Sequence, residues 1–361
     1  MNWFIIIFFI ISVILFFITK HYLVKTKLKN KQVTEEIEAF EVDNNRTTTE
    51  KLKVYHNITL KFLDENSASE LVKKDGEYIQ GMNQPNLIAR NCLSIHDLYE
   101  KYKNGFEKIT PEEKETINEF ILSLLTDISK FSAPYYRYIC KWLNDISIAK
   151  AKNWLEAGMP HTLEKTIVMD ANWFINPRTT TLVHEMIHIH QREIGFDFED
   201  LYKELGYYYY PEYIKGMTDI YPLNRNNPDG LSKYWLWKLP KESKSNTMNN
   251  TMNNYWWIGA IFKSITPNSL NDVNLVALKL DSDNEGNFYY LKQHPTFLNK
   301  WQSFITFFGD NPNNYHPNEM TAKFAEYYLL DILNDKNRDF DNYEGYKIYK
   351  KYFENMIKKY Y

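Results

Sequence analysis

The sequence predicts an α+β fold with a mostly helical N-terminal region and a single N-terminal transmembrane helix. Three observations support this prediction. Residues 3–19 are apolar without interruption, residues 110–158 carry apolar side chains at helical spacing, and short β-branched or aromatic runs recur from residue 166 onward. Runs of helices followed by runs of strands are typical of α+β proteins. A chain of 361 residues can form one large domain or two smaller ones.

The first element is the run from Trp3 to Thr19 (WFIIIFFIISVILFFIT), which has no charged residue. As a helix it would span about 26 Å, just enough for the hydrocarbon layer when Lys20 extends toward the head groups. A cleaved signal peptide is the alternative, but no basic segment precedes the run and no small-residue cleavage site follows it. We therefore expect an anchor at residues 1–22 and a polar tether at residues 23–50.

The charges beside this run predict its orientation. Lysines follow it at positions 20, 25, 27, 29 and 31. By the positive-inside rule, the C-terminal domain of this single-pass protein would lie on the cytosolic side. Asn45 and Asn57 begin N-x-S/T sequons, which would matter only in a lumen.

Residues 51–157 form the expected helical N-terminal region. Thr110-Pro111-Glu112-Glu113 is a capping box with proline at the first helical position, so it predicts a helix to about Phe131. A second helix is expected from about Pro134 to just before Gly158, because residues 135, 139, 142, 146 and 149 are apolar. This apolar stripe could line a groove, but core packing is its commoner role.

Three short runs read as strands. They are Thr166–Asp170, residues 256–262 (WWIGAIF) and residues 275–280 (LVALKL).

The most informative motif is His184-Glu185-Met186-Ile187-His188. On a helix, positions four apart share one face, so both imidazoles can reach one metal ion. Glu185 lies about 100° around the helix from His184, close enough to meet a water at that ion. Zn²⁺ binds imidazole nitrogen readily, and a carboxylate beside its water can accept a proton. His190 lies about 200° from His188 and is expected to be a core histidine or a partner of the site.

The surroundings of the motif favour a buried helix. Thr179 to Thr181 offer N-cap oxygens, and Gly195 is placed to end the helix. The residues between them are apolar nearly all round, and burying His184, Glu185 and His188 there without partners would cost several kcal/mol. A bound metal would remove that cost.

Two histidines leave a zinc site one protein ligand short. Residues 317–333 are expected to form a helix with Glu319 in its first turn, on the same face as Glu326. Glu319 could be the third ligand, or an ordinary N-terminal glutamate favoured by the helix dipole.

The chain resembles the gluzincin metallopeptidases, in which a helix-borne glutamate completes a zinc site begun by H-E-x-x-H. Among these, it resembles more closely membrane-anchored metallopeptidases encoded by large DNA viruses. The shared segments are spread over residues 158 to 330, a span of about half the chain: Gly158–Thr162, Thr181–Arg192 (TLVHEMIHIHQR), Asn227–Gly230 and Tyr315–Glu319.

This resemblance implies a zincin-like catalytic domain at residues 158–361, with a large insertion at residues 196–312. It implies Zn²⁺ held by His184, His188 and Glu319, with Glu185 as general base and a peptide or protein as substrate. It also implies a virion or host membrane. Gluzincins commonly carry an acidic residue four positions after the ligand glutamate, but Lys323 stands there. Glu326 or Asp229 could substitute as the partner of a ligand histidine.

Peptide hydrolysis also needs a donor to the oxyanion. Tyr315 and His161 are the candidates, although Tyr315 could be core packing and His161 a surface residue. In zinc peptidases, a strand beside the metal helix often pairs with an extended substrate, and Thr166–Asp170 is placed for this role.

Composition and charge narrow the range of expected functions. The net charge is −3 and no basic stripe with interleaved aromatics stands out, so nucleic acid is not an expected partner. Two cysteines are too few for a disulfide framework. Two other functions stay open: a catalytically silent zinc-binding structural or virion membrane protein, and a zinc hydrolase of a non-peptide amide.

Overall fold

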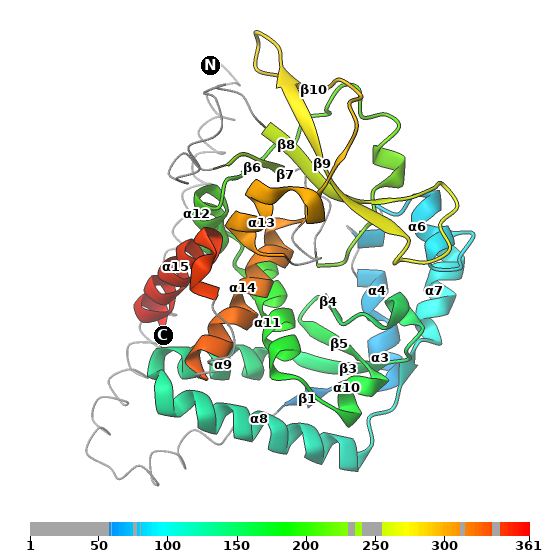
Figure 1. The fold of residues 1–361 in the computed structure, drawn as a ribbon. Helices are drawn as coiled ribbons and strands as arrows, with labels where there is room; N and C mark the ends of the chain where they lie inside the picture. Colours follow the sequence, from blue (N-terminus) through cyan, green and yellow to red (C-terminus); the bar gives the residue numbers. More distant parts are fainter. Residues whose placement is uncertain are drawn as a thin grey trace, which may run out of the picture. The chain divides into compact units, whose positions relative to one another are not determined.

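Two β-sheets and the helices around them form the part of the chain that the computed structural model describes, which is residues 58, 60–74, 78–79, 81–229, 235–239, 255–310, 315–333 and 340–361. Residues from Ile58 to Tyr361 cluster into one compact unit. Figure 1 labels most of its helices and strands.

The first sheet has the strand order β1-β3-β5-β4, with β2 paired to β3 beside β1. Its strands are β1 (Lys61–Phe62), β2 (Phe106–Glu107), β3 (Ser147–Ala151), β4 (His161–Leu163) and β5 (Thr166–Asp170). Strand β3 is parallel to β1 and β5, whereas β4 is antiparallel to β5 and β2 is antiparallel to β3. Strand β5 is therefore internal, and β4 forms the edge of the sheet.

A set of short helices shares a hydrophobic core with this sheet. They are α3 (Glu65–Ser69), α4 (Leu71–Lys74), α6 (Gln84–Ala89) and α7 (Ile95–Lys103). Leu71, Leu87 and Leu98 from these helices cluster with Ala149 of β3 and Val168 of β5. Residues on both sides of position 157 thus build one sheet and one core.

Helices α8 (Pro111–Phe131) and α9 (Ala133–Asp145) pack on each other, and α8 also contacts α10 (Ala171–Ile175). The capping box at Thr110 and Glu113 is confirmed, since each side chain accepts from the other residue's backbone N–H. The second predicted helix is too long. It ends at Asp145, and residues 147–151 form strand β3, whose partners β1 and β5 are distant in sequence.

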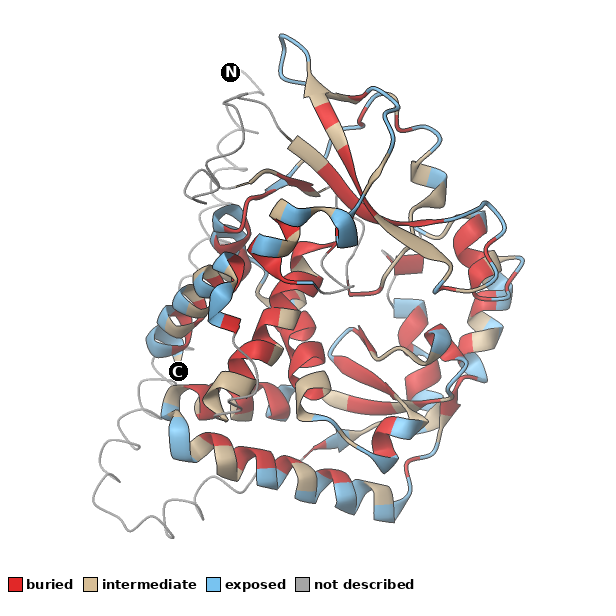
Figure 2. Cartoon of the chain, in the orientation of Figure 1, coloured by how far each residue is buried: buried red, intermediate tan, exposed pale blue. Residues whose placement is uncertain are grey.

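Helices α11 (Thr179–Glu193) and α14 (Pro317–Ile332) lie side by side near the centre of Figure 1. Figure 2 shows α11 buried along most of its length, as its apolar sequence predicts. The capping residues predicted for the two ends of α11 are wrong. Residue Arg178 occupies the N-cap without a side-chain bond. Gly195 has right-handed helical angles and precedes the next helix, because Ile194 already leaves helical geometry.

The second sheet is antiparallel, with the order β10-β9-β8-β7-β6 and β11 paired to β9. Its strands are β6 (Tyr207–Tyr209), β7 (Trp235–Trp237), β8 (Tyr255–Phe262), β9 (Val273–Ser282), β10 (Phe288–Tyr290) and β11 (Thr296–Phe297). Strands β8 and β9 confirm the two downstream strand predictions. The whole sheet falls inside residues 196–312, as do helices α12 (Phe196–Glu204) and α13 (Gln302–Phe308). Helix α15 (Glu344–Tyr360) packs against α9, α12, α13 and α14.

Two predictions are corrected. Within the described ranges, no helix is both long enough and apolar enough to cross a bilayer. The longest, α8, has 21 residues but is amphipathic, with charged residues such as Glu112, Glu113 and Lys114. The transmembrane helix of the predicted fold class, and the membrane localisation with a cytosolic C-terminal domain, are therefore withdrawn. The run Trp3–Thr19 lies outside the described residues.

Candidate metal centre

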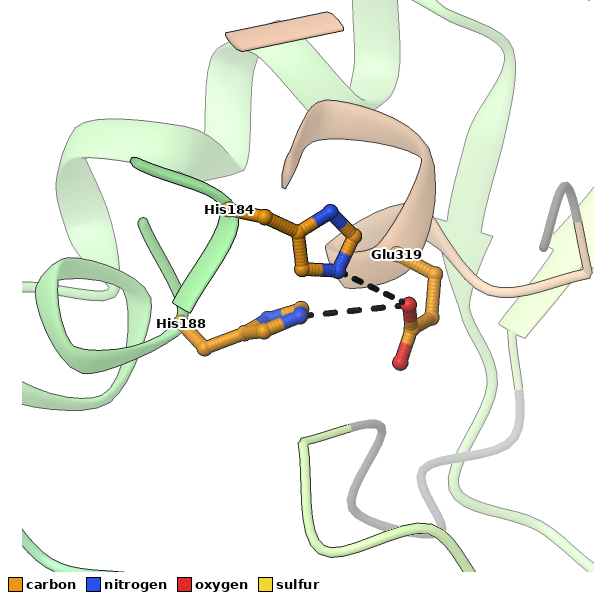
Figure 3. Close-up of side chains that lie close together, drawn as sticks. All are labelled: His184, His188 and Glu319. Atoms are coloured by element: carbon orange, nitrogen blue, oxygen red, sulfur yellow. Dashed lines mark ion pairs between the residues drawn. The ribbon is translucent and has the colours of Figure 1, made fainter. Parts of the chain in front are cut away.

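Three side chains from α11 and α14 meet at one point (Figure 3). One Glu319 carboxylate oxygen, Oε2, lies 3.4 Å from His184 Nε2 and 3.8 Å from His188 Nε2. The two imidazoles are four residues apart on α11, so one helical face presents both. Glu319 lies in the first turn of α14. The structure thus brings together His184, His188 and Glu319, the three predicted ligands.

These residues fit a zinc ion. Ligand atoms about 2.05 Å from a tetrahedral ion lie about 3.3 Å apart, close to the separations found here. The Nε2 atom of His188 is buried without a hydrogen-bond partner. A buried nitrogen of this kind is costly unless something binds it. Two imidazoles and a carboxylate are also the donor set of a catalytic zinc site.

The outer nitrogen of each histidine is held by a separate acceptor. His184 Nδ1 lies 2.8 Å from Glu326 Oε1, and His188 Nδ1 lies 2.9 Å from Gln191 Oε1. Gln191 is fixed in turn by donating to the Asn318 carbonyl and to Thr321 of α14. These contacts turn each Nε2 toward Glu319. Glu326, one of the two proposed substitutes for the residue at position 323, is the residue that contacts His184.

The pKa values of the three side chains reflect a balance between burial and the charged or hydrogen-bonded groups around them. Burial alone would raise the pKa of Glu319, but the imidazoles of His188 and His184 lower it to about 2. Burial lowers the pKa of His188. For His184 burial also lowers the pKa, yet the hydrogen bonds to Glu319 and Glu326 outweigh it and raise the pKa well above its usual range.

Glu185 is buried beside the three predicted ligands. Burial, together with the Asp229 carboxylate, raises the pKa of Glu185 well above its ordinary range. Its Oε2 atom has no hydrogen-bond partner. Glu185, His188 and Asp229 place ligand-type atoms within 4.8 Å of one another. Glu185 therefore presents a free carboxylate oxygen next to His188.

Tyr315 lies on the Glu319 side of the site. Asn227 donates through Nδ2 to Glu319 Oε1 and, over 2.8 Å, to the Tyr315 hydroxyl. Arg225 also donates to this hydroxyl, over 2.9 Å. With both lone pairs of its oxygen engaged, Tyr315 keeps its own proton to donate. Burial raises the pKa of Tyr315 and so favours the protonated form.

His161 is a buried residue of β4, not a surface histidine. Its Nδ1 lies 3.0 Å from the Met159 carbonyl, and its Nε2 has no hydrogen-bond partner. A hydrogen on Nδ1 would leave Nε2 as an acceptor; a second proton would make it a donor.

The expected substrate-pairing strand is placed differently. Strand β5 is internal to the sheet, and β4 is its edge. The outer edge of β4 is engaged at Thr162, whose N–H donates to Asp229 over 2.9 Å. Arg192 lies 3.5 Å from the Thr162 carbonyl and donates to the Glu164 carbonyl over 2.8 Å. An extended peptide would find the backbone groups of Thr162 already paired.

A cavity of about 240 Å³ opens onto the site. His184, Glu185 and Glu319 lie in its wall, together with both predicted oxyanion donors, Tyr315 and His161. Five of the six predicted site residues line this one space, and His188 is the exception.

Several residues of the site escaped the sequence reasoning. Gln191 is three residues beyond His188, a spacing that puts it within reach on the same helix, so it could have been foreseen. Arg225 and Asn227 belong to a loop that is positioned by the bridge between Asn224 and Ile261 of β8. No local sequence pattern predicts that these two residues reach the site.

Comparison of the chain with protein-family models, with curated proteins and with solved structures found no match.

Proposed function

We propose that this chain is a zinc-dependent metallopeptidase. The observation that supports the proposal most is the meeting of His184, His188 and Glu319 at distances that suit one ion, with the carboxylate of Glu185 beside them. Position 185 is the general base that the H-E-x-x-H resemblance implies. The cavity beside the site gives a substrate access to these groups.

His184, His188 and Glu319 would hold the ion. When bound, zinc would supply a Lewis acid that polarises the scissile carbonyl and makes a water acidic enough to react near neutral pH. Glu185 takes a proton from the attacking water and delivers it to the leaving amine. Tyr315 donates its hydroxyl hydrogen to the developing oxyanion, because its oxygen already accepts two hydrogen bonds. The Nε2 of His161 is the second candidate donor.

The test compares two variants of the full chain. Glu185→Gln should keep its zinc, measured by plasma mass spectrometry, and lose peptide cleavage by about 100-fold or more, measured on a peptide library. Glu319→Ala should lose much of the zinc itself. Circular dichroism checks that both variants fold.

Three outcomes separate the alternatives. Cleavage by Glu185→Gln at the wild-type rate would remove this residue from the base role. Full zinc occupancy in Glu319→Ala would remove Glu319 as a ligand. Zinc bound by the wild-type chain without turnover of peptides or of other amides would favour the silent structural protein.

A further inference from the structure

Arg225 is a cation in the wall of the cavity that no carboxylate neutralises within the described part of the chain. Arg90, the other arginine in this wall, is paired with Glu156 at 2.9 Å. The Arg225 guanidinium donates to two neutral groups, the Leu270 carbonyl at 3.3 Å and the Tyr315 hydroxyl at 2.9 Å. A guanidinium has five N–H donors, so most of those on Arg225 stay available to a ligand.

The backbone holds Arg225 firmly at this place. Its N–H donates to the Ala260 carbonyl of β8 over 2.8 Å, and the preceding residue, Asn224, forms an antiparallel bridge with Ile261. The guanidinium lies over the ring of Tyr315, 5.5 Å from its centre. The side chain is thus positioned before any substrate arrives, which lowers the entropic cost of binding.

We propose that Arg225 binds the C-terminal carboxylate of a peptide substrate, so that the enzyme is a carboxypeptidase. This inference rests on the proposed function. Arginine forms paired hydrogen bonds with carboxylates, and a charge-assisted bond of this kind is stronger than a neutral one. A substrate carboxylate would otherwise face the acidic side chains of Glu185, Glu319 and Asp229 in the same wall.

The distance from Arg225 to the ligands sets the length of the released fragment. Tyr315 and Asn227 connect Arg225 to Glu319 through three successive hydrogen bonds. At about 3 Å each, these bonds separate the Arg225 guanidinium from the Glu319 carboxylate by at most about 9 Å. An extended residue spans about 3.5 Å, so one or two residues fit between the scissile bond and the carboxylate.

The reaction is a hydrolysis near the C-terminus. The C–N bond of the last or penultimate peptide link breaks. The acyl carbon gains the hydroxyl of the water, and the leaving amine gains its proton through Glu185. No oxidant or further reactant is needed.

Two other features fit this substrate class. The backbone groups of Thr162 on the β4 edge are engaged by Asp229 and Arg192, so the edge offers little to a long extended peptide. Met159 and Leu270 add apolar surface to the cavity wall. An apolar C-terminal side chain therefore suits the space near Arg225.

The test uses the zinc-loaded full chain and two probes, N-acetyl-Ala-Ala-Phe and its C-terminal amide. Wild type should favour the acid by about 10- to 100-fold in kcat/KM, the range expected for charged hydrogen bonds. In Arg225→Gln, the KM for the acid should rise until this preference is lost, and any loss of amide turnover through the missing hydrogen bond to Tyr315 should be smaller than the loss on the acid. Arg225→Lys should retain part of the preference. Lys263→Gln, which removes an exposed cation outside the cavity, should behave as wild type.

The affinity for the two probes can also be measured without cleavage. In the Glu185→Gln background, calorimetry should show tighter binding of the acid than of the amide, and Arg225→Gln should abolish the difference. Equal use of acid and amide by wild type would overturn the carboxypeptidase assignment and leave the peptidase proposal standing. An equal loss on both probes in Arg225→Gln would also overturn it, since Arg225 would then act only through Tyr315. If no peptide is cleaved at all, the proposed function itself fails.

Discussion

His184 and His188, the proposed ligand histidines, each depend on one acceptor for their orientation, and the two acceptors differ in charge. Glu326 holds His184 and is itself paired with Lys323 at 2.8 Å, whereas neutral Gln191 holds His188. A carboxylate behind an imidazole fixes the tautomer and raises the basicity of the ligand nitrogen. The charge of Glu326 therefore bears directly on metal affinity.

We predict that Glu326→Ala weakens zinc binding by about 10- to 100-fold, the usual effect of removing such a partner. Glu326→Gln should cause a smaller loss, because an amide oxygen still accepts from Nδ1 but carries no charge. Competition with a chromophoric chelator measures both affinities. The control is Glu354→Gln, which removes a partly exposed carboxylate of α15 that pairs with Lys358 and does not line the cavity. Wild-type affinity in Glu326→Ala would show that His184 needs no acceptor.

The sequence predicts this site unevenly, residue by residue. His184, Glu185 and His188 follow from a local helical spacing, and their burial follows from the apolar residues around them. Glu319 could be predicted as a ligand only from the resemblance to gluzincins. No local sequence pattern distinguishes a metal-binding glutamate from an ordinary glutamate in the first turn of a helix. Arg225 could not be predicted at all, since the pairing of Asn224 with β8 is what brings it to the cavity.

Helix α8 begins at a cap that the sequence makes explicit. Thr110 accepts from the Glu113 N–H, and the Glu113 side chain accepts from the Thr110 N–H over 2.9 Å. The start of this helix is thus specified by four adjacent residues, and its position was predicted correctly.

We predict that Thr110→Ala lowers the free energy of unfolding by about 1 kcal/mol, the typical cost of losing an N-cap. Thr116→Ala is the matched control, a threonine in the interior of the same helix that bonds only to the Glu112 carbonyl. Alanine has the higher helix propensity, so this change should be neutral or slightly stabilising. Urea unfolding measures both. Equal losses would mean that the cap contributes nothing specific.

Elements whose limits depend on distant partners were harder to predict. Ile146 and Ala149 fit the apolar stripe of the predicted helix, but Ile146 is the C-cap of α9 and Ala149 pairs with Val168 of β5 as part of strand β3. Likewise, the strand at Thr166–Asp170 was predicted correctly, yet its internal position was not. Local periodicity defines a strand, whereas its place in the sheet depends on which other segments pair with it.

At the scale of the whole molecule, one buried ion pair joins three distant stretches of chain. Arg90, at the end of α6, pairs with Glu156 before β4 and donates to the Asn226 carbonyl in the loop that also carries Arg225. Tyr102 of α7 donates to Glu156 over 2.8 Å. Glu156 and the following Ala157 have positive φ angles of 45° and 56°. These contacts hold a conformation that costs energy for residues with a side chain.

We predict that Arg90→Met lowers the free energy of unfolding by about 3–5 kcal/mol, because Glu156 is left buried without its counter-charge. The double variant Arg90→Met with Glu156→Leu should recover much of that loss. Urea unfolding of the wild type, both single variants and the double variant gives the coupling between the two residues. Additive losses would show that the pair is not coupled.

The Arg90–Glu156 pair also makes the free energy of unfolding depend on pH. Burial alone would raise the pKa of Glu156, but the Arg90 guanidinium outweighs it and lowers the pKa from 4.5 to about 2. A folded-state pKa below the unfolded value stabilises the protein at pH values above the unfolded pKa, and that stabilisation disappears as the pH falls toward the folded value. Between about pH 5 and pH 3, the wild type should therefore lose more unfolding free energy than the double variant, in which no group titrates at this position. Parallel pH profiles for the two proteins would assign the acid sensitivity to other carboxylates, such as Glu319.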